Sequence, residues 1–241
     1  MLLEHCTWPE VERYLARKTG ILIPIGSVEQ HGPTGLMGTD IQCAQAIAAA
    51  AGAALDVLVA PPIPVGLAEH HMGFAGSMTL QKYTLVAVIR DYVASLRRHG
   101  FRRFYFVNGH GGNIVTLNQT LKALDAAESG NDVARHTFVN WWAGPRTKAL
   151  REAWFGSGEG IHATPSEIAV TQFTEPAASK PQQSIPQAPK AQSFSTAEDY
   201  RGKFPDGRAG SDVTLATPEA GRRLIDAAVA DIAEHYAAFA A

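Results

Sequence analysis

The chain has 241 residues, of which 46% are hydrophobic, and a formal net charge of −2 from 21 basic and 23 acidic residues. A chain of this size can bury a full core, so we expect one globular domain over residues 1–241. The charges are scattered, which argues against nucleic acid or a membrane surface as a partner. The two cysteines are too few for a disulfide framework, and neither an export signal nor an apolar run long enough to span a membrane is recognisable. We therefore expect a soluble, cytoplasmic protein.

The first part of the chain predicts alternating helices and strands. A capping-box pattern with an early proline at Thr7–Glu10 begins a short helix. The run Gly20–Gly26 is apolar throughout, as in a parallel strand that is covered on both faces. Asp40 then begins an alanine-rich helix that ends at about Ala54, and a short strand follows at 57–60.

The same order continues further along the chain. Apolar residues at helical spacing predict a helix from Thr79 to about His99, followed by a strand at 104–107. A helix at 114–127 and a strand at 137–140 come next. Strands that alternate with helices of this length predict an α/β fold with a mainly parallel sheet and helices on both faces.

Residues 175–206 differ in composition from the rest of the chain. Five prolines punctuate this segment, which is rich in Ser, Gln and Ala and has little periodicity, so we expect irregular chain. Long irregular segments inside a compact domain are usually disordered or functional. With Phe194, Tyr200 and Phe204 as anchors, a packed loop at a subunit interface or at the rim of an active site is predicted. A final helix then begins at Thr217 and runs almost to the end of the chain.

The first turn with potential chemistry follows the strand at Gly20–Gly26, where open α/β sheets bind ligands. Glu29 and His31 are two residues apart, a spacing that points both side chains to the same side of an extended chain. Asp40 lies at the start of a helix, where its carboxylate would cap the helix or bridge two cations. On spacing alone, a plain N-cap aspartate beside a solvated Glu-His pair explains the pattern equally well.

The second such turn is Asn108–Asn113, in which three glycines surround His110. These glycines indicate a tight backbone that something approaches closely. A phosphate-binding turn is one alternative, but Ile114 occupies the place of the third glycine of a dinucleotide fingerprint, and the next strand ends at Asn140 rather than at an acid. Carboxylates and imidazoles from both turns are ligands of Zn²⁺, Mn²⁺ or Fe²⁺, which predicts a metal site. A non-catalytic nucleotide- or metal-binding module remains the alternative class, whereas no G-x-S-x-G elbow supports a serine hydrolase.

The order and spacing of the motifs resemble the creatininase (creatinine amidohydrolase) family over nearly the whole chain. The resemblance rests on Ile25–Pro33, Thr39–Asp40, Glu69–His70 before Phe74–Ser77, Asn108–Asn113, His162 with Glu167, Phe204–Gly207 and Ala216–Glu219. It implies a three-layer α/β/α amidohydrolase that holds two divalent cations per subunit, Zn, Mn or Fe, and assembles as a hexamer.

The resemblance also implies roles for individual residues. Glu29 and His110 would hold one cation, His31 would hold the other, and Asp40 would bridge both. A water between the cations would attack the amide carbon. Two cations lower the pKa of this water and stabilise the oxyanion, which allows an unactivated amide to react near neutral pH. The substrate would be a small-molecule amide.

The late His162 and Glu167 match the catalytic histidine and glutamate of the family, where the histidine passes a proton to the departing nitrogen. One position departs from the family pattern. Creatinine-hydrolysing members carry a glutamate ligand two residues after the histidine of the glycine turn, and this chain has Gly112 there. We expect Glu167 to supply the replacement carboxylate; otherwise the second metal site is weak or empty.

The glycine at position 112 also affects the predicted substrate. Because many members of the resembled family that have this glycine act on other small amides, the resemblance implies a small cyclic amide or a formamide, with creatinine itself and a peptide end as alternatives. Trp141 and Trp142 follow a strand and would wall a planar substrate or, alternatively, fill a core or subunit interface; Trp154 is expected in a loop. The candidate substrate-binding residues are Glu69, His70, Gly111, Trp141 and Trp142.

Overall fold

The computed structural model describes residues 1–130, 132–181 and 185–241. At its centre is a four-stranded parallel sheet in the order β2-β1-β3-β4. The strands are β1 (Gly20–Ile25), β2 (Leu58–Val59), β3 (Arg103–Asn108) and β4 (Arg135–Asn140). The helices are α1 (Trp8–Leu15), α2 (Thr39–Leu55), α3 (Lys82–Arg98), α4 (Ile114–Ala127), α5 (Pro145–Phe155), α6 (Pro165–Thr174), α7 (Ala197–Lys203) and α8 (Pro218–Ala240).

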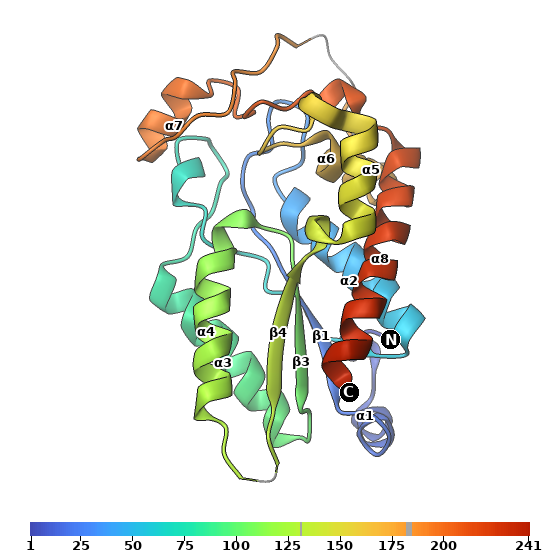
Figure 1. Cartoon of the computed structure of the whole chain (residues 1–241). Coiled ribbons are helices and arrows are strands. Elements are labelled where there is room, and N and C mark those ends of the chain that lie inside the picture. The colour runs from blue at the N-terminus through green and yellow to red at the C-terminus, as the bar shows by residue number, and fades with distance from the viewer. Residues whose placement is uncertain (131, 182–184) are drawn as a thin grey trace.

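Helices cover the sheet on both faces, as Figure 1 shows. Successive side chains of a strand point to opposite faces, so Leu22 and Tyr105 pack in one core with α2, α6 and α8, whereas Ile23 and Phe106 pack in the other with α3 and α4. Every residue of β1 is buried. The three-layer α/β/α arrangement with a parallel sheet is therefore confirmed.

The register of the strands sets the position of the functional turns. Ile25 at the end of β1 pairs with Asn108 at the end of β3, which in turn pairs with Asn140 at the end of β4. Because these parallel strands end at the same level, the turns that follow them begin side by side. The turn that carries Glu29 and the turn that carries His110 thus meet at one edge of the sheet.

Several predicted elements differ from the structure. Helices α5 and α6 were not expected from the sequence, and Trp154 lies on α5 rather than in a loop. Both helices begin with a proline in the first turn, and α6 also has a capping box formed by Thr164 and Glu167. Their apolar residues are too few and too short in span to give a clear helical period.

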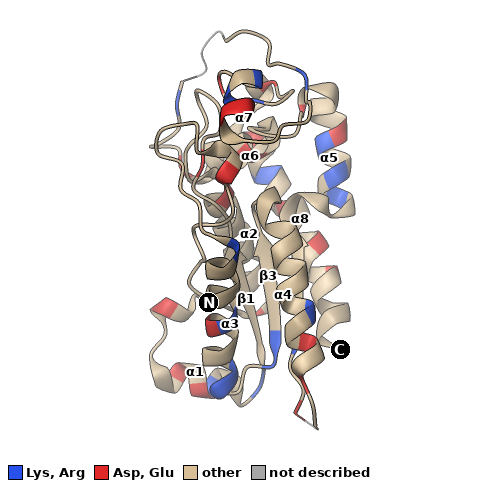
Figure 2. Cartoon of the chain, turned by 90° about the vertical axis from the view of Figure 1, so that its left-hand side faces the viewer, with Lys and Arg blue, Asp and Glu red and all other residues tan. Residues whose placement is uncertain are grey.

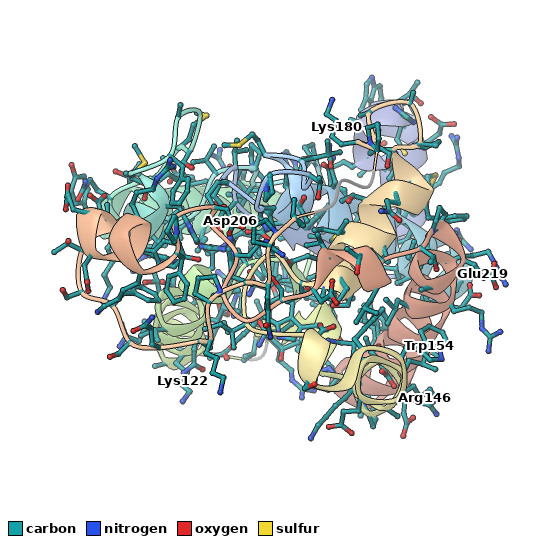
Figure 3. All side chains as sticks on the ribbon, turned by 90° about the horizontal axis from the view of Figure 1, so that it is seen from above. Lys122, Arg146, Trp154, Lys180, Asp206 and Glu219 are labelled. Atoms are coloured by element: carbon teal, nitrogen blue, oxygen red, sulfur yellow. The ribbon has the colours of Figure 1, made fainter. Side chains whose placement is uncertain are left out.

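The segment 175–206 runs across the top of the molecule in Figure 1, beyond the ends of the strands. It is not irregular throughout, because it contains the short helix α7; residues 182–184 lie outside the described part of the chain. Its own residues Tyr200 and Phe204 are buried. The segment is also held by the buried Arg208, whose guanidinium donates to Asp206 at 2.6 Å and to the carbonyl of Pro186. Seen from above, Asp206 lies near the middle of the molecule, whereas Arg146 of α5 points outward at its edge (Figure 3).

The charged residues do not separate into regions of one sign on the face shown in Figure 2, where α1, α5 and α7 each carry residues of both signs. Among the described residues, no helix is long and apolar enough to cross a membrane.

Candidate metal centre

Four side chains predicted to bind metal converge at the carboxyl edge of the sheet. Glu29 and His31 come from the turn after β1, Asp40 from the first turn of α2, and His110 from the turn after β3. None of the four is more than 4% exposed. Together they form a buried group of carboxylate and imidazole donors drawn from three separate segments.

Asp40 lies at the centre of this group. Its Oδ1 lies 3.0 Å from Nε2 of His31, and its Oδ2 lies 2.8 Å from Nδ1 of His110. His110 Nδ1 is also 3.3 Å from Oε2 of Glu29. The N-cap of α2 is Gly38, so Asp40 does not cap the helix and the plain N-cap interpretation is wrong.

The fit of this group to a cation is visible in its hydrogen bonds. Although Nδ1 of His110 lies 2.8 Å away, the buried Oδ2 of Asp40 receives no well-aligned hydrogen bond from any described residue. Nδ1 of His110 and Oδ2 of Asp40 are thus close together but poorly aligned for a hydrogen bond, as two ligands of one cation are. A mixed set of carboxylate oxygens and imidazole nitrogens suits Zn²⁺, Mn²⁺ or Fe²⁺.

Backbone carbonyls orient both imidazoles. Nδ1 of His31 lies 3.0 Å from the carbonyl oxygen of Glu29, and Nε2 of His110 lies 2.9 Å from that of Leu67. A carbonyl only accepts, so the nitrogen that faces it carries a proton, and the other nitrogen of each ring faces Asp40. Metal-binding histidines are characteristically held in this way.

A second group lies on the other side of Glu29. Nε2 of His71 is 3.0 Å from Oε1 of Glu29, and Nδ1 of His162 is 3.8 Å from the same oxygen. The rings of His71 and His162 are stacked, with centroids 4.2 Å apart. Like the group of Glu29, His31 and Asp40, these three residues have donor atoms close enough to share a metal ion.

Gln30 connects the two histidines of the second group. Its side-chain Nε2 donates to Nδ1 of His71 at 3.0 Å; it also lies 2.9 Å from Nε2 of His162, but that contact joins two donors and is not a hydrogen bond. Its side-chain oxygen accepts from the backbone N–H of Gly32 at 2.9 Å, which fixes which end of the amide faces the histidines. Nε2 of His162 also lies 2.7 Å from the carbonyl oxygen of Gln30, so this nitrogen carries the proton and Nδ1 is the free nitrogen.

Glu167 lies at the edge of the first group. Its Oε1 is 3.9 Å from Nε2 of His31 and accepts from the backbone N–H of Thr164 at 2.5 Å, as part of the capping box of α6. The N-terminus of α6 therefore brings this carboxylate to the site. At position 112 there is no room for one, because a Cβ there would lie 2.3 Å from the carbonyl oxygen of Leu67.

The charges of the site shift its pKa values strongly. Burial by itself lowers the pKa of His31 and His110, but the carboxylates around them raise it to about 10 and about 9. Burial by itself raises the pKa of Asp40, but His31 and His110 hold it well below its usual range. Burial raises the pKa of Glu167 to about 7, although the nearby His31 opposes this. Protons thus compete with any cation for this site.

The two histidines of the second group have pKa values that are lowered rather than raised. Burial, followed by the neighbouring histidines, lowers the pKa of His71 to about 2 and that of His162 well below its usual value. Both rings are therefore neutral near pH 7 and have one nitrogen each without a proton. A neutral imidazole can accept a proton or bind a metal.

The two groups face a cavity of about 500 Å³. Of the predicted substrate-binding residues, His70, Gly111, Trp141 and Trp142 line it. Glu69 does not: it is exposed, and the next-but-one residue, His71, faces the site instead. Trp141 is also buried in the core, so both interpretations of this residue apply.

Sequence reasoning did not select several residues that the structure brings to the site. They are Gln30, Arg151, Phe194 and Tyr200. The sequence does predict His71 beside the site, together with Glu69 and His70, and the structure places His71 against Glu29. Phe194 and Tyr200 could have been found from the sequence, because they are aromatic anchors of the segment 175–206, for which an active-site rim was one expectation. Gln30 could have been found because it lies between Glu29 and His31.

The comparison with protein families agrees with this geometry. The family model described as creatinine amidohydrolase matches residues 4–236. The chain belongs to the creatininase family.

Curated relatives match parts of the chain. A mycofactocin precursor peptide peptidase of Mycolicibacterium smegmatis is 38% identical over 110 residues, which cover 43% of this chain and 44% of that protein. A creatinine amidohydrolase of Pseudomonas putida is 31% identical over 117 residues, which cover 46% of this chain and 45% of the relative. In each case the chain spans less than half the length of the curated relative that it matches.

Solved creatininase structures share the whole fold. A creatininase crystal structure covers 99% of this chain and 97% of its own chain, with a TM-score of 0.84 and 21% identity. A structure titled as the manganese form gives a TM-score of 0.82, also at 21% identity. These similarities show that the creatininase fold is present from end to end.

Proposed function

We propose that this protein is a metal-dependent amidohydrolase that cleaves a C–N bond of a small amide. Two divalent cations would be held by Glu29 and His110 on one side and His31 on the other, with Asp40 between them. The observation that carries the proposal is the placement of Asp40, whose two buried oxygens lie 3.0 Å and 2.8 Å from different imidazoles, and whose Oδ2 receives no well-aligned hydrogen bond from the described residues. Membership of the creatininase family supports it.

The divalent cations, Zn, Mn or Fe, supply a water of lowered pKa and stabilise the negative charge that develops on the amide oxygen. The residues of the chain keep the site ready for them. The carbonyls of Glu29 and Leu67 hold His31 and His110 with one nitrogen facing Asp40, so little reorientation is needed. Glu167 provides a further carboxylate beside His31, which supports its role as the replacement for the missing glutamate at position 112.

His162 would move the proton that the reaction requires. An amide nitrogen leaves poorly unless it is protonated. Because Nε2 of His162 faces the carbonyl oxygen of Gln30, its unprotonated Nδ1 is available on the side of Glu29. His162 can take a proton at Nδ1 from the attacking water and then donate it to the departing nitrogen.

The proposed substrate is a cyclic amide or a formamide. The cavity of about 500 Å³ is in the range of pockets that enclose drug-sized ligands, so it is not restricted to a compound as small as creatinine. A peptide end is the second candidate, because the relatives with 34% to 38% identity are described as peptidases. The alternative of a non-catalytic nucleotide module needs only the glycine turn, and it does not explain why carboxylates and imidazoles converge from three segments.

The first experiment is elemental analysis of the wild type and of the variant Asp40→Ala, both purified without chelator. We expect about two equivalents of a transition metal in the wild type and a clear loss in the variant. Creatinine, lactams, formamides and short peptides are then tested for hydrolysis by the loaded wild type. A wild type that stays free of metal after reconstitution would sink the two-cation mechanism and favour the binding module.

We also infer that the protein acts in the cytoplasm as a homo-oligomer, with a hexamer as the specific expectation. The support for the hexamer is the family resemblance, and the two free cysteines, Cys6 and Cys43, are in keeping with a reducing compartment. Light scattering coupled to size-exclusion chromatography measures the assembly directly.

A further inference from the structure

The lining of the cavity has an uneven distribution of charge. Its acidic residues are Glu29, Asp40 and Glu167, which all belong to the candidate metal centre. Arg151 of α5 is the single lysine or arginine among the described residues that line it. The function proposed above gives no role to this arginine.

Arg151 is held in place by two hydrogen bonds. Its Nε donates to Oε1 of Glu159 at 2.7 Å, and its Nη1 donates to the carbonyl oxygen of Trp142 at 3.0 Å. Its side chain is 20% exposed. The same oxygen of Glu159 accepts from the hydroxyl of Ser166 at 2.5 Å, so the partner of the arginine is itself fixed. A guanidinium held in this way loses little conformational freedom when it binds a ligand.

The free donors of Arg151 are on the end of the guanidinium. The group has five N–H donors, and the two hydrogen bonds to Glu159 and Trp142 use one on Nε and one on Nη1. Nη2 makes no hydrogen bond with any residue in the described part of the chain. Two parallel donors from Nη1 and Nη2 match the two oxygens of a carboxylate.

A chain of contacts joins Arg151 to the metal centre along one wall of the cavity. The hydroxyl of Ser166, which binds Glu159, lies 3.0 Å from the hydroxyl of Thr164. The backbone N–H of Thr164 donates to Glu167, which lies beside His31. Thr164, Ser166 and Glu167 all line the cavity. A ligand that reached both the metal centre and Arg151 would lie along these residues.

We propose that Arg151 recognises a carboxylate on the substrate, so that the preferred substrates are amides that also carry a carboxylate group. This inference rests on the proposed function and narrows it to acidic lactams, N-formyl amino acids or peptides with a free C-terminus. A neutral amide of the same shape leaves the free donors of Arg151 without a charged acceptor. Hydrogen bonds to charged groups contribute enough to change affinity roughly tenfold to a hundredfold.

The test uses two pairs of probes that differ only in this group: pyroglutamate with pyroglutamamide, and N-formylphenylalanine with its C-terminal amide. Dissociation constants are measured by calorimetry on the wild type and on Arg151→Gln, Arg151→Lys and Lys148→Gln, each with and without Zn²⁺. Lys148 is a matched control, because it lies on the same helix, is exposed, and does not line this cavity. Melting temperatures show which variants fold, and Arg151→Lys keeps the charge if Arg151→Gln is unstable.

We expect the wild type and Lys148→Gln to bind the acid of at least one pair about tenfold more tightly than its amide. Arg151→Gln is expected to lose this preference, and Arg151→Lys to keep only part of it. Equal binding of acid and amide by the wild type in both pairs overturns the proposal. A preference that survives in Arg151→Gln also overturns it, because the carboxylate is then bound by the metal or by another group.

The outcomes separate this inference from the proposed function. A protein that holds metal and hydrolyses amides without preferring the acids contradicts only the role of Arg151. A protein that shows an Arg151-dependent preference but takes up no metal contradicts only the hydrolase.

Discussion

Nε2 of His110 lies 2.9 Å from the carbonyl oxygen of Leu67, and Gly112 packs against both of these atoms. A Cβ at position 112 would lie 2.3 Å from the carbonyl oxygen and 2.4 Å from the ring nitrogen. Glycine is therefore required here for the hydrogen bond that orients His110. A side chain at position 112 therefore cannot be accommodated without moving a candidate metal ligand.

This contact predicts the effect of a side chain at position 112. We expect Gly112→Ala to lower the free energy of unfolding by about 1–3 kcal/mol, because overpacking forces backbone and ring apart, and to weaken Zn²⁺ binding. Gly112→Glu is expected to behave similarly, so a glutamate there does not complete the site. The control is Gly111→Ala, since a Cβ at position 111 meets nothing within 4 Å. Urea unfolding and competitive chelator titration measure both effects, and equal behaviour of the two alanine variants would contradict the prediction.

His71 is predicted to support metal binding through its contact with Glu29. Its Nε2 lies 3.0 Å from Oε1 of Glu29, so removal of the ring leaves this carboxylate held only through Oε2, which accepts from the hydroxyl of Ser27 at 2.8 Å, and through weaker contacts. We expect His71→Ala to reduce Zn²⁺ affinity about tenfold to a hundredfold, as loss of a residue that orients a ligand typically does. The neighbouring His70→Ala is the control, because His70 packs its ring against His71, Phe194 and Tyr200 but forms no ion pair or hydrogen bond with Glu29 in the described part of the chain. An affinity within twofold of the wild type in His71→Ala, in a protein that remains folded, would show that Glu29 does not depend on it.

Phe194 is predicted to contribute to substrate binding rather than to stability. It lines the cavity, is 37% exposed, and stacks on His70 with centroids 5.0 Å apart. We expect Phe194→Ala to raise KM about fivefold by removing apolar contact area, with little change in kcat. Phe173→Ala removes a ring of similar exposure that does not line the cavity, and it should leave KM unchanged. Steady-state kinetics decide this, and a fall in kcat at constant KM is the contrary result.

Asp231 predicts a pH-dependent contribution to stability far from the metal centre. Burial by itself raises its pKa, but hydrogen bonds from the backbone of Thr147 and Arg146 and from the Thr147 hydroxyl lower the pKa of Asp231 below 3.8. Because the folded-state pKa is the lower one, the stabilisation is complete above the unfolded-state pKa of 3.8 and is lost as the pH falls through the folded-state value.

The variant Asp231→Asn tests this sign. We expect the substitution to lower the free energy of unfolding by about 1–3 kcal/mol at pH 7, because the buried donors of Arg146 and Thr147 lose a charged acceptor. The difference from the wild type should stay constant between pH 7 and about pH 5 and become smaller below about pH 4. Urea unfolding at several pH values provides the measurement. A difference that grows on acidification would mean that the pKa of Asp231 is raised by folding.

The positions of the two principal turns followed from the sequence because they depend on local patterns. The apolar run of β1 and the glycine after it predict a buried parallel strand, and β3 repeats the signal. Parallel strands end at a common edge, so Glu29, His31 and His110 were expected near one another before any contact was known. The i, i+2 spacing predicted that Glu29 and His31 point to the same side, and the family motifs implied that these residues bind metal.

The sequence by itself thus determined the layers of the fold, the edge that carries the chemistry, and four of its buried donors. Only the tertiary structure decided that Asp40 faces two imidazoles instead of capping α2, that Gln30 reaches His162 across 132 residues of sequence, and that Arg151 lines the same cavity. The physical reason is that strand and turn patterns report local backbone preferences and burial. The contacts of Gln30 and Arg151 depend on how α5, α6 and the segment 175–206 pack over the edge of the sheet, and no single stretch of the chain encodes that packing.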